Sequence, residues 1–184
     1  MLVFTCSIRR KAGRCCRRAR KTFMTYTCNK YNDDRQYDSL IEMLLKGPYR
    51  IVDILPEQVP ADAGRRYFTV EKYFLQPERI RNLRLRFAEI LLRLNCYYEM
   101  AVSFDGSCSW EKDPDPEMFA VKLSCLSGNC GFRAVFEAQH AMIDIQPDDT
   151  YMTVYDPDSL ITDRLSVLAA AEGLFVWIPP GSEN

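Results

Sequence analysis

The stretch QPERIRNLRLRFAEILLRLNCYY, residues 76–98, decides the fold, because it is the clearest helix in the sequence. Pro77 suits the first turn of a helix. Apolar residues then recur at intervals of three and four along one face, at Ile80, Leu83, Phe87, Ile90 or Leu91, and Leu94. This pattern predicts a helix over residues 77–96 whose apolar face packs on a sheet.

Three shorter elements are expected on the N-terminal side of this helix. The segment DSLIEMLLKGPYR, residues 38–50, predicts a short helix that Gly47 and Pro48 end. The run YRIVDIL, residues 49–55, is typical of a strand. After a loop rich in proline and glycine, RYFTVEKYFL, residues 66–75, has apolar residues at a period of two and predicts a second strand.

Short strands are expected on the C-terminal side, from Glu99 onward. Turn compositions such as DGS, DPDPE, SGN and QPDD separate apolar segments there, which favours an antiparallel meander. The expected strands are EMAVSF (99–104), MFAVKLSC (118–125), FRAVFEA (132–138), AMIDI (141–145) and YMTVYD (151–156).

The last unit is DPDSLITDRLSVLAAAEGLFVWIPP, residues 156–180. Asp156 can cap a helix that begins at Pro157, and Gly173 can end that helix. The run LFVWI then returns as a strand, and the prolines after it stop the strand.

This order of elements predicts an α+β fold. We expect a mainly antiparallel sheet of about five or six strands with two or three helices on one face. The order is compatible with an elaborated ferredoxin-like or split β-α-β arrangement. Residues 31–180 form a single globular domain in this interpretation, residues 181–184 form a frayed tail, and the sheet face without helices is the more available surface.

The N-terminal segment differs in charge from the rest of the chain. Residues 1–30 contain nine Lys or Arg and no acid, which leaves 15 positive against 25 negative residues, a net charge of −10, in the remainder. Such a basic arm can bind phosphates, whereas the acidic body disfavours polyanions. The alternative is that Met24 is the true start and that the arm, including RRKAGRCCRRARK at residues 9–21, lies outside the fold.

The chain has no segment with the length and apolar character of a membrane span. Its eight cysteines could form disulfides in a secreted protein, but the sequence shows no pattern typical of an export signal. A cytoplasmic protein with reduced thiols is therefore the expectation. Cys125 and Cys130 are too isolated from a second ligand pair to predict a metal site, although whether they pair or bind metal stays open. We expect no cofactor.

No catalytic residue is predicted. His140 is the only histidine, and the sequence contains no glycine-rich phosphate loop, no G-x-S-x-G elbow and no H-E-x-x-H motif. The carboxylates cluster where turns and helix caps ordinarily place them.

The candidate binding residues fall into two groups. Arg79, Arg86 and Arg93 lie seven apart and give the 77–96 helix a basic side. The aromatic candidates for a protein contact are Tyr97, Tyr98, Trp110 and Trp177.

Three classes of function remain open on this basis. A non-enzymatic module that binds another protein is favoured. One alternative is a nucleic-acid-binding protein that uses the basic arm and the arginine side of the helix. A second alternative is an enzyme with a Cys/His or carboxylate centre.

Overall fold

The computed structural model describes residues 37–106, 109–128, 131–180 and 182. Its α-helices are α2 (Asp38–Leu44), α3 (Gly64–Phe74), α4 (Pro77–Asn95), α5 (Pro116–Ser124) and α6 (Thr162–Ala171). Its strands are β1 (Tyr49–Asp53), β2 (Ala101–Ser103), β3 (Glu111–Lys112), β4 (Phe132–Phe136), β5 (Ala141–Ile145), β6 (Met152–Tyr155) and β7 (Phe175–Trp177). Short 3₁₀ turns occur at Ala61–Ala63 and Glu137–Gln139.

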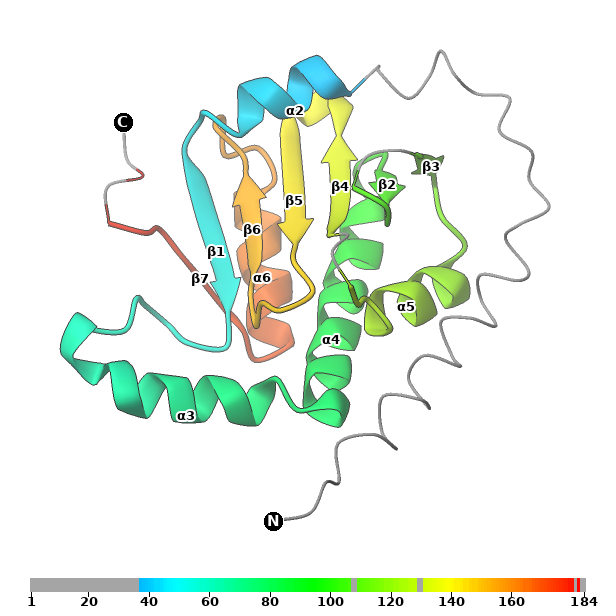
Figure 1. Ribbon diagram of the computed structural model, residues 1–184. Coiled ribbons are helices and arrows are strands. Elements are labelled where there is room, and N and C mark those ends of the chain that lie inside the picture. Colours follow the sequence, from blue (N-terminus) through cyan, green and yellow to red (C-terminus); the bar gives the residue numbers. More distant parts are fainter. Residues whose placement is uncertain (1–36, 107–108, 129–130, 181, 183–184) are drawn as a thin grey trace.

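All seven strands join one sheet in the order β3-β2-β4-β5-β6-β1-β7, and every neighbouring pair is antiparallel (Figure 1). The α+β class is therefore confirmed, with more strands than the expected five or six. Strands β6 and β7 both run antiparallel to β1, which lies between them, and α6 connects them. This C-terminal part is a split β-α-β unit.

Helices α4, α5 and α6 pack on one face of the sheet and enclose the main core with it. The helix predicted over 77–96 is confirmed, and its apolar face is buried there. Aromatic rings close the core beside α5, since the ring centroid of Phe132 lies 4.9 Å from that of Phe104 and 5.7 Å from that of Phe119. Among the described helices, none is long and apolar enough to cross a membrane.

The opposite face of the sheet is only partly covered. Helix α2 buries Ile41 and Leu44 against Ala101, Val135 and Met142, so it shields β2, β4 and β5. Helix α2 lies at one end of this face and α3 at the other, and β6 and β1 are open between them (Figure 1). The face that the element order left available is thus open over one half of the sheet.

The expected strand over residues 66–75 was wrong, because this segment lies in α3. A helical period also fits it: the Tyr67 hydroxyl donates to the Glu71 carboxylate four residues on (3.0 Å), and Thr69 donates to the Arg65 carbonyl (3.0 Å). Contacts between residues four apart are typical of a helix. The period-two pattern of apolar residues that suggested a strand is weaker, because Lys72 interrupts it.

The expected strand over residues 118–125 was also wrong, because this segment belongs to α5. The composition DPDPE was interpreted as a turn, yet Asp115 is the N-cap of α5 and its Oδ1 accepts a hydrogen bond from the Met118 N–H (2.9 Å). Pro116 then occupies the first turn, and Phe119 and Leu123, four residues apart, enter the main core.

The last helix begins at Thr162 rather than at Pro157. Asp156 nevertheless stabilises its start, and its fully buried carboxylate accepts hydrogen bonds from the Leu160 N–H (3.1 Å), the Ile161 N–H (3.2 Å) and the Thr162 hydroxyl (2.6 Å). Gly173 ends this segment with a φ of +67°, as predicted.

We expect the substitution Asp156→Ala to lower the free energy of unfolding by about 2 kcal/mol, because it leaves the buried Ile161 N–H without an acceptor and removes two further hydrogen bonds. Urea unfolding followed by circular dichroism measures this loss. Asp158→Ala is the matched control, since Asp158 is exposed in the same loop and should change the free energy of unfolding by less than about 0.5 kcal/mol. Equal losses in the two variants would contradict the capping role.

Candidate functional site

A groove of about 630 Å³ occupies the open half of the sheet face. We call it the tyrosine groove and define it by the six aromatic residues that line it, Tyr49, Tyr67, Phe68, Tyr151, Tyr155 and Trp177. Its volume lies in the range of sites that hold a small molecule or a short peptide segment.

Strands β6, β1 and β7 form the floor of the groove. Their register places Tyr49 opposite Tyr155, with ring centroids 5.9 Å apart, and places Ile51 between Thr153 and Trp177. Side chains at alternate positions of a strand share one face, so these residues all point away from the main core. The floor is therefore a continuous, mainly aromatic surface.

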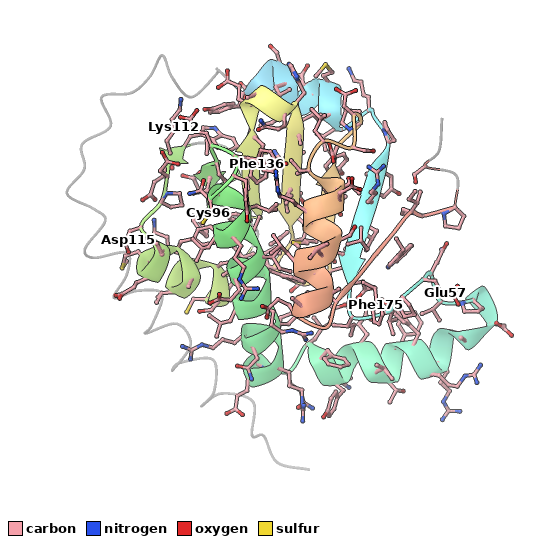
Figure 2. The ribbon with its side chains drawn as sticks, turned by 180° about the vertical axis from the view of Figure 1, so that it is seen from behind. Glu57, Cys96, Lys112, Asp115, Phe136 and Phe175 are labelled. Carbon is pink, nitrogen blue, oxygen red and sulfur yellow. The ribbon has the colours of Figure 1, made fainter. Side chains whose placement is uncertain are left out.

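The loop after β1 and the first turns of α3 form the wall. Leu55, Glu57 and Val59 from the loop, with Tyr67 and Phe68 from α3, complete the lining. Phe68 is 63% exposed, and none of the described side chains of α3 is fully buried. Figure 2 shows Glu57 at the α3 end of the molecule, far from Lys112 and Asp115.

Asp53 is the acidic residue of the groove floor. Asp53 lies at every second position after Tyr49 and Ile51, so its side chain shares their face of β1. It lines the groove and is only 7% exposed. Its Oδ1 accepts a hydrogen bond from the Ile54 N–H (2.6 Å). Burial raises the pKa of this carboxyl from 3.8 to about 6, although hydrogen bonds from the Ile54 and Leu55 N–H groups act in the opposite direction.

Two tyrosines near Asp53 each donate a hydrogen bond from the hydroxyl to a different carboxylate. Tyr67 donates to Glu71, and Tyr151 donates to Asp149. Burial raises the pKa of Tyr67 and of Tyr151 to about 12, and the neighbouring carboxylates add to both shifts. Both tyrosines therefore stay neutral at physiological pH and present apolar rings with polar tips.

The electrostatic character of the groove is negative. Among the described residues that line it, Asp53 and Glu57 are acidic and none is lysine, arginine or histidine. On the neighbouring part of the same sheet face, Arg133 pairs with Asp144 at 2.9 Å. The groove thus combines aromatic surface with uncompensated negative charge.

The three arginines predicted as a basic binding side are engaged within the fold. Arg86 donates from Nε to the Glu172 carbonyl (2.7 Å), and Arg93 pairs with the Glu172 carboxylate (2.9 Å), so both tie α4 to the end of α6. The Arg79 guanidinium lies 3.6 Å from the centroid of the Tyr73 ring. A binding role for these residues stays a prediction.

The aromatic candidates lie apart from one another. Trp110 is partly buried and packs on Tyr37, with ring centroids 4.8 Å apart, in the small core under α2. Tyr97 is 61% exposed beside Tyr98, and the Arg164 guanidinium lies 4.3 Å from the Tyr97 ring centroid. Of the four aromatic candidates, Trp177 alone lines the tyrosine groove.

Asp53 was missed by the sequence interpretation. Its signal is the position of an acid on the apolar face of a strand, since Tyr49, Ile51 and Asp53 alternate in YRIVD. The segment YMTVYD carries a matching alternation at Tyr151, Thr153 and Tyr155.

The described part of the chain contains no group of three or more His, Cys, Asp or Glu residues that could hold a metal ion. Cys130, the suggested partner of Cys125, lies outside the described residues. The basic arm of residues 1–30 also lies outside them. His140 is exposed at a turn and does not line the groove.

The chain matches no protein-family model, no curated protein and no solved structure. The geometry and electrostatics of the groove are therefore what indicates a function.

Proposed function

We propose that this protein is a non-enzymatic binding module that holds a segment of another protein in the tyrosine groove. The observation that carries the proposal is the cluster of six aromatic side chains around a groove on an open sheet face. Tyrosine and tryptophan are enriched where proteins meet, because they offer large apolar area with a polar tip. Exposed apolar side chains at the rim, such as Phe68, extend the surface beyond the groove.

The charge of the groove supports a protein partner over nucleic acid. Phosphate binding needs lysine or arginine at the surface, whereas the described lining of this groove is acidic. Nucleic-acid binding would therefore have to use the basic arm of residues 1–30 or another surface.

An enzyme with a carboxylate centre is the second candidate, and the pKa of about 6 at Asp53 is the observation that favours it. Acid–base catalysis would need a second group placed at the reacting atoms. The described lining contains no serine, cysteine or histidine, and Glu57, its other acid, is exposed on the loop. These features support binding more strongly than catalysis.

The test uses the full chain and a phage-displayed library of random 12-residue peptides. Recovered peptides are labelled with fluorescein, and their dissociation constants are measured by fluorescence anisotropy. We expect Thr153→Trp, which fills the groove floor between the tyrosines, to weaken binding at least about tenfold. The matched control is Val167→Trp, because Val167 is 71% exposed on α6, across the sheet from the groove.

Three results would contradict the proposal. The library could yield no enriched peptide, or the recovered peptides could bind the Thr153→Trp protein as tightly as the wild type. The third is that single-stranded dT12 binds more tightly than any recovered peptide with a steep dependence on salt, which would favour the nucleic-acid alternative.

A further inference from the structure

Asp53 is unusual because none of the described lysine, arginine or histidine side chains forms an ion pair with its buried carboxylate. The carboxylates of Glu89, Glu111, Asp144 and Glu172, by contrast, are ion-paired. Its hydrogen bonds come from backbone N–H groups alone. A buried charge without a partner destabilises a fold, and such groups concentrate at functional sites.

The described residues that line the groove supply no positive charge to Asp53. Tyr67 of α3 and Tyr151 of the turn before β6 lie near Asp53, and both stay neutral at physiological pH while their hydroxyls donate to Glu71 and Asp149. Glu57 adds a second acid to the groove lining. A positive group placed here would gain favourable electrostatic energy without displacing a cation of the protein itself.

The aromatic walls favour a guanidinium over an ammonium group. A guanidinium is planar, stacks on aromatic faces and is weakly hydrated, so it enters an aromatic site with a smaller desolvation penalty. Described residues already make this contact, with Arg79 on Tyr73 (3.6 Å) and Arg164 on both Tyr97 (4.3 Å) and Tyr98 (5.2 Å).

We infer that the partner segment inserts an arginine side chain into the tyrosine groove, where its guanidinium pairs with the Asp53 carboxylate between the tyrosine rings. This inference rests on the proposed function, because it identifies the part of the protein partner that the groove recognises. Charge complementarity supplies the specificity, and the aromatic walls supply the contact area. Asp53 acts as a recognition residue.

The test uses Trp177 as a reporter, since the chain has two tryptophans and only this one lines the groove. In a Trp110→Phe background, Trp177 fluorescence is titrated with acetyl-Gly-Arg-Gly-amide and with the same tripeptide carrying citrulline, the neutral isostere of arginine. We expect the arginine tripeptide to bind at least about tenfold more tightly, the preference of a charge-assisted contact over a neutral one.

Asp53→Asn should abolish this preference, because the amide keeps the shape of the side chain and its acceptor for the Ile54 N–H but removes the charge. Asp163→Asn is the matched control, since Asp163 is exposed on α6 and should leave the preference unchanged. Equal binding of the two tripeptides, no binding of either one, or a preference that survives in Asp53→Asn would overturn the inference.

The two proposals fail in different ways. If library peptides bind the groove but arginine is not preferred over citrulline, the proposed function is supported and the arginine inference is contradicted. If the arginine tripeptide is preferred but no library peptide binds more tightly than that tripeptide, the guanidinium site is supported. The proposal of a protein partner is then contradicted.

Discussion

Replacing Asp53 with asparagine will raise the free energy of unfolding at pH 7.5 by about 3 kcal/mol. Burial raises the pKa of Asp53 from 3.8 to about 6 in the folded protein, and each pKa unit corresponds to about 1.4 kcal/mol. Asparagine fills the same space and cannot ionise, so the variant avoids the penalty of a buried charge. The backbone hydrogen bonds to Asp53 are already included in that pKa.

The effect depends on pH in a defined direction. The folded state binds the Asp53 proton more tightly than the unfolded state does, so the wild type loses stability as the pH rises from about 4 to about 6. Well below pH 3.8 the carboxyl is neutral in both states, so the difference between the two proteins should shrink toward zero as the pH falls to that range. Above pH 7 the difference should reach its plateau of about 3 kcal/mol.

Urea unfolding of both proteins at a series of pH values between 3.5 and 8, spaced by about half a unit, measures this difference. Other titrating groups cancel in the comparison, including Asp149, whose pKa is raised mainly by burial. Tyr67 and Tyr151 titrate near pH 12 and do not contribute in this window. A difference that is constant with pH, or a destabilised variant at pH 7.5, would show that Asp53 is not held as a costly buried charge.

This gain in stability would accompany the loss of arginine recognition expected for the same variant. A residue that destabilises the fold and is retained for binding is a common arrangement at functional sites. The pairing also makes Asp53→Asn a clean test, because weaker binding could not result from failure to fold.

The sequence predicted the scaffold better than the site. The helix over 77–96 and the strands around Val52, Ala134, Ile143 and Val154 follow from strong local periodicity and were confirmed. The segments of α3 and α5 were misassigned because a few apolar residues fit a period of two nearly as well as a helical one. In α5 the cap formed by Asp115 was the signal that decides between them.

The groove could not be predicted, because it depends on the order of strands. It needs β1 beside both β6 and β7, which places Tyr49 opposite Tyr155 and Ile51 opposite Trp177, residues more than a hundred positions apart. Local pattern fixes which face of a strand is apolar but not which strand lies next to it. The alternation in YRIVD and YMTVYD therefore indicated surfaces without showing that they meet.

The arginines of α4 show a second limit. Residues at a spacing of seven share a helix face, but the spacing does not show whether solvent or another helix meets that face. Arg84 is the extreme case, since it is 4% exposed although its neighbours in the sequence suggested a basic, solvated side. Its guanidinium donates to the carbonyls of Leu126 and Pro147, which lie in two loops far apart in the sequence.

Arg84→Ala is accordingly expected to lower the free energy of unfolding by about 4 kcal/mol, the largest loss we predict for a single substitution. It leaves two carbonyl groups without their charged donor and opens a cavity beneath α4. Burial lowers the pKa of the Arg84 guanidinium, although the group remains charged at neutral pH. Burying this charge carries a desolvation penalty, which its hydrogen bonds to the two carbonyls offset.

Two companion variants separate the hydrogen bonds from the volume. Arg84→Met keeps most of the side-chain volume and should lose about 2 kcal/mol if the bonds to Leu126 and Pro147 contribute as expected. Arg81→Ala removes an exposed arginine from the same helix and should change the free energy of unfolding by less than about 0.5 kcal/mol. A wild-type value for Arg84→Met would mean that the guanidinium stabilises the fold only by filling space, since a methionine without donors would then serve as well.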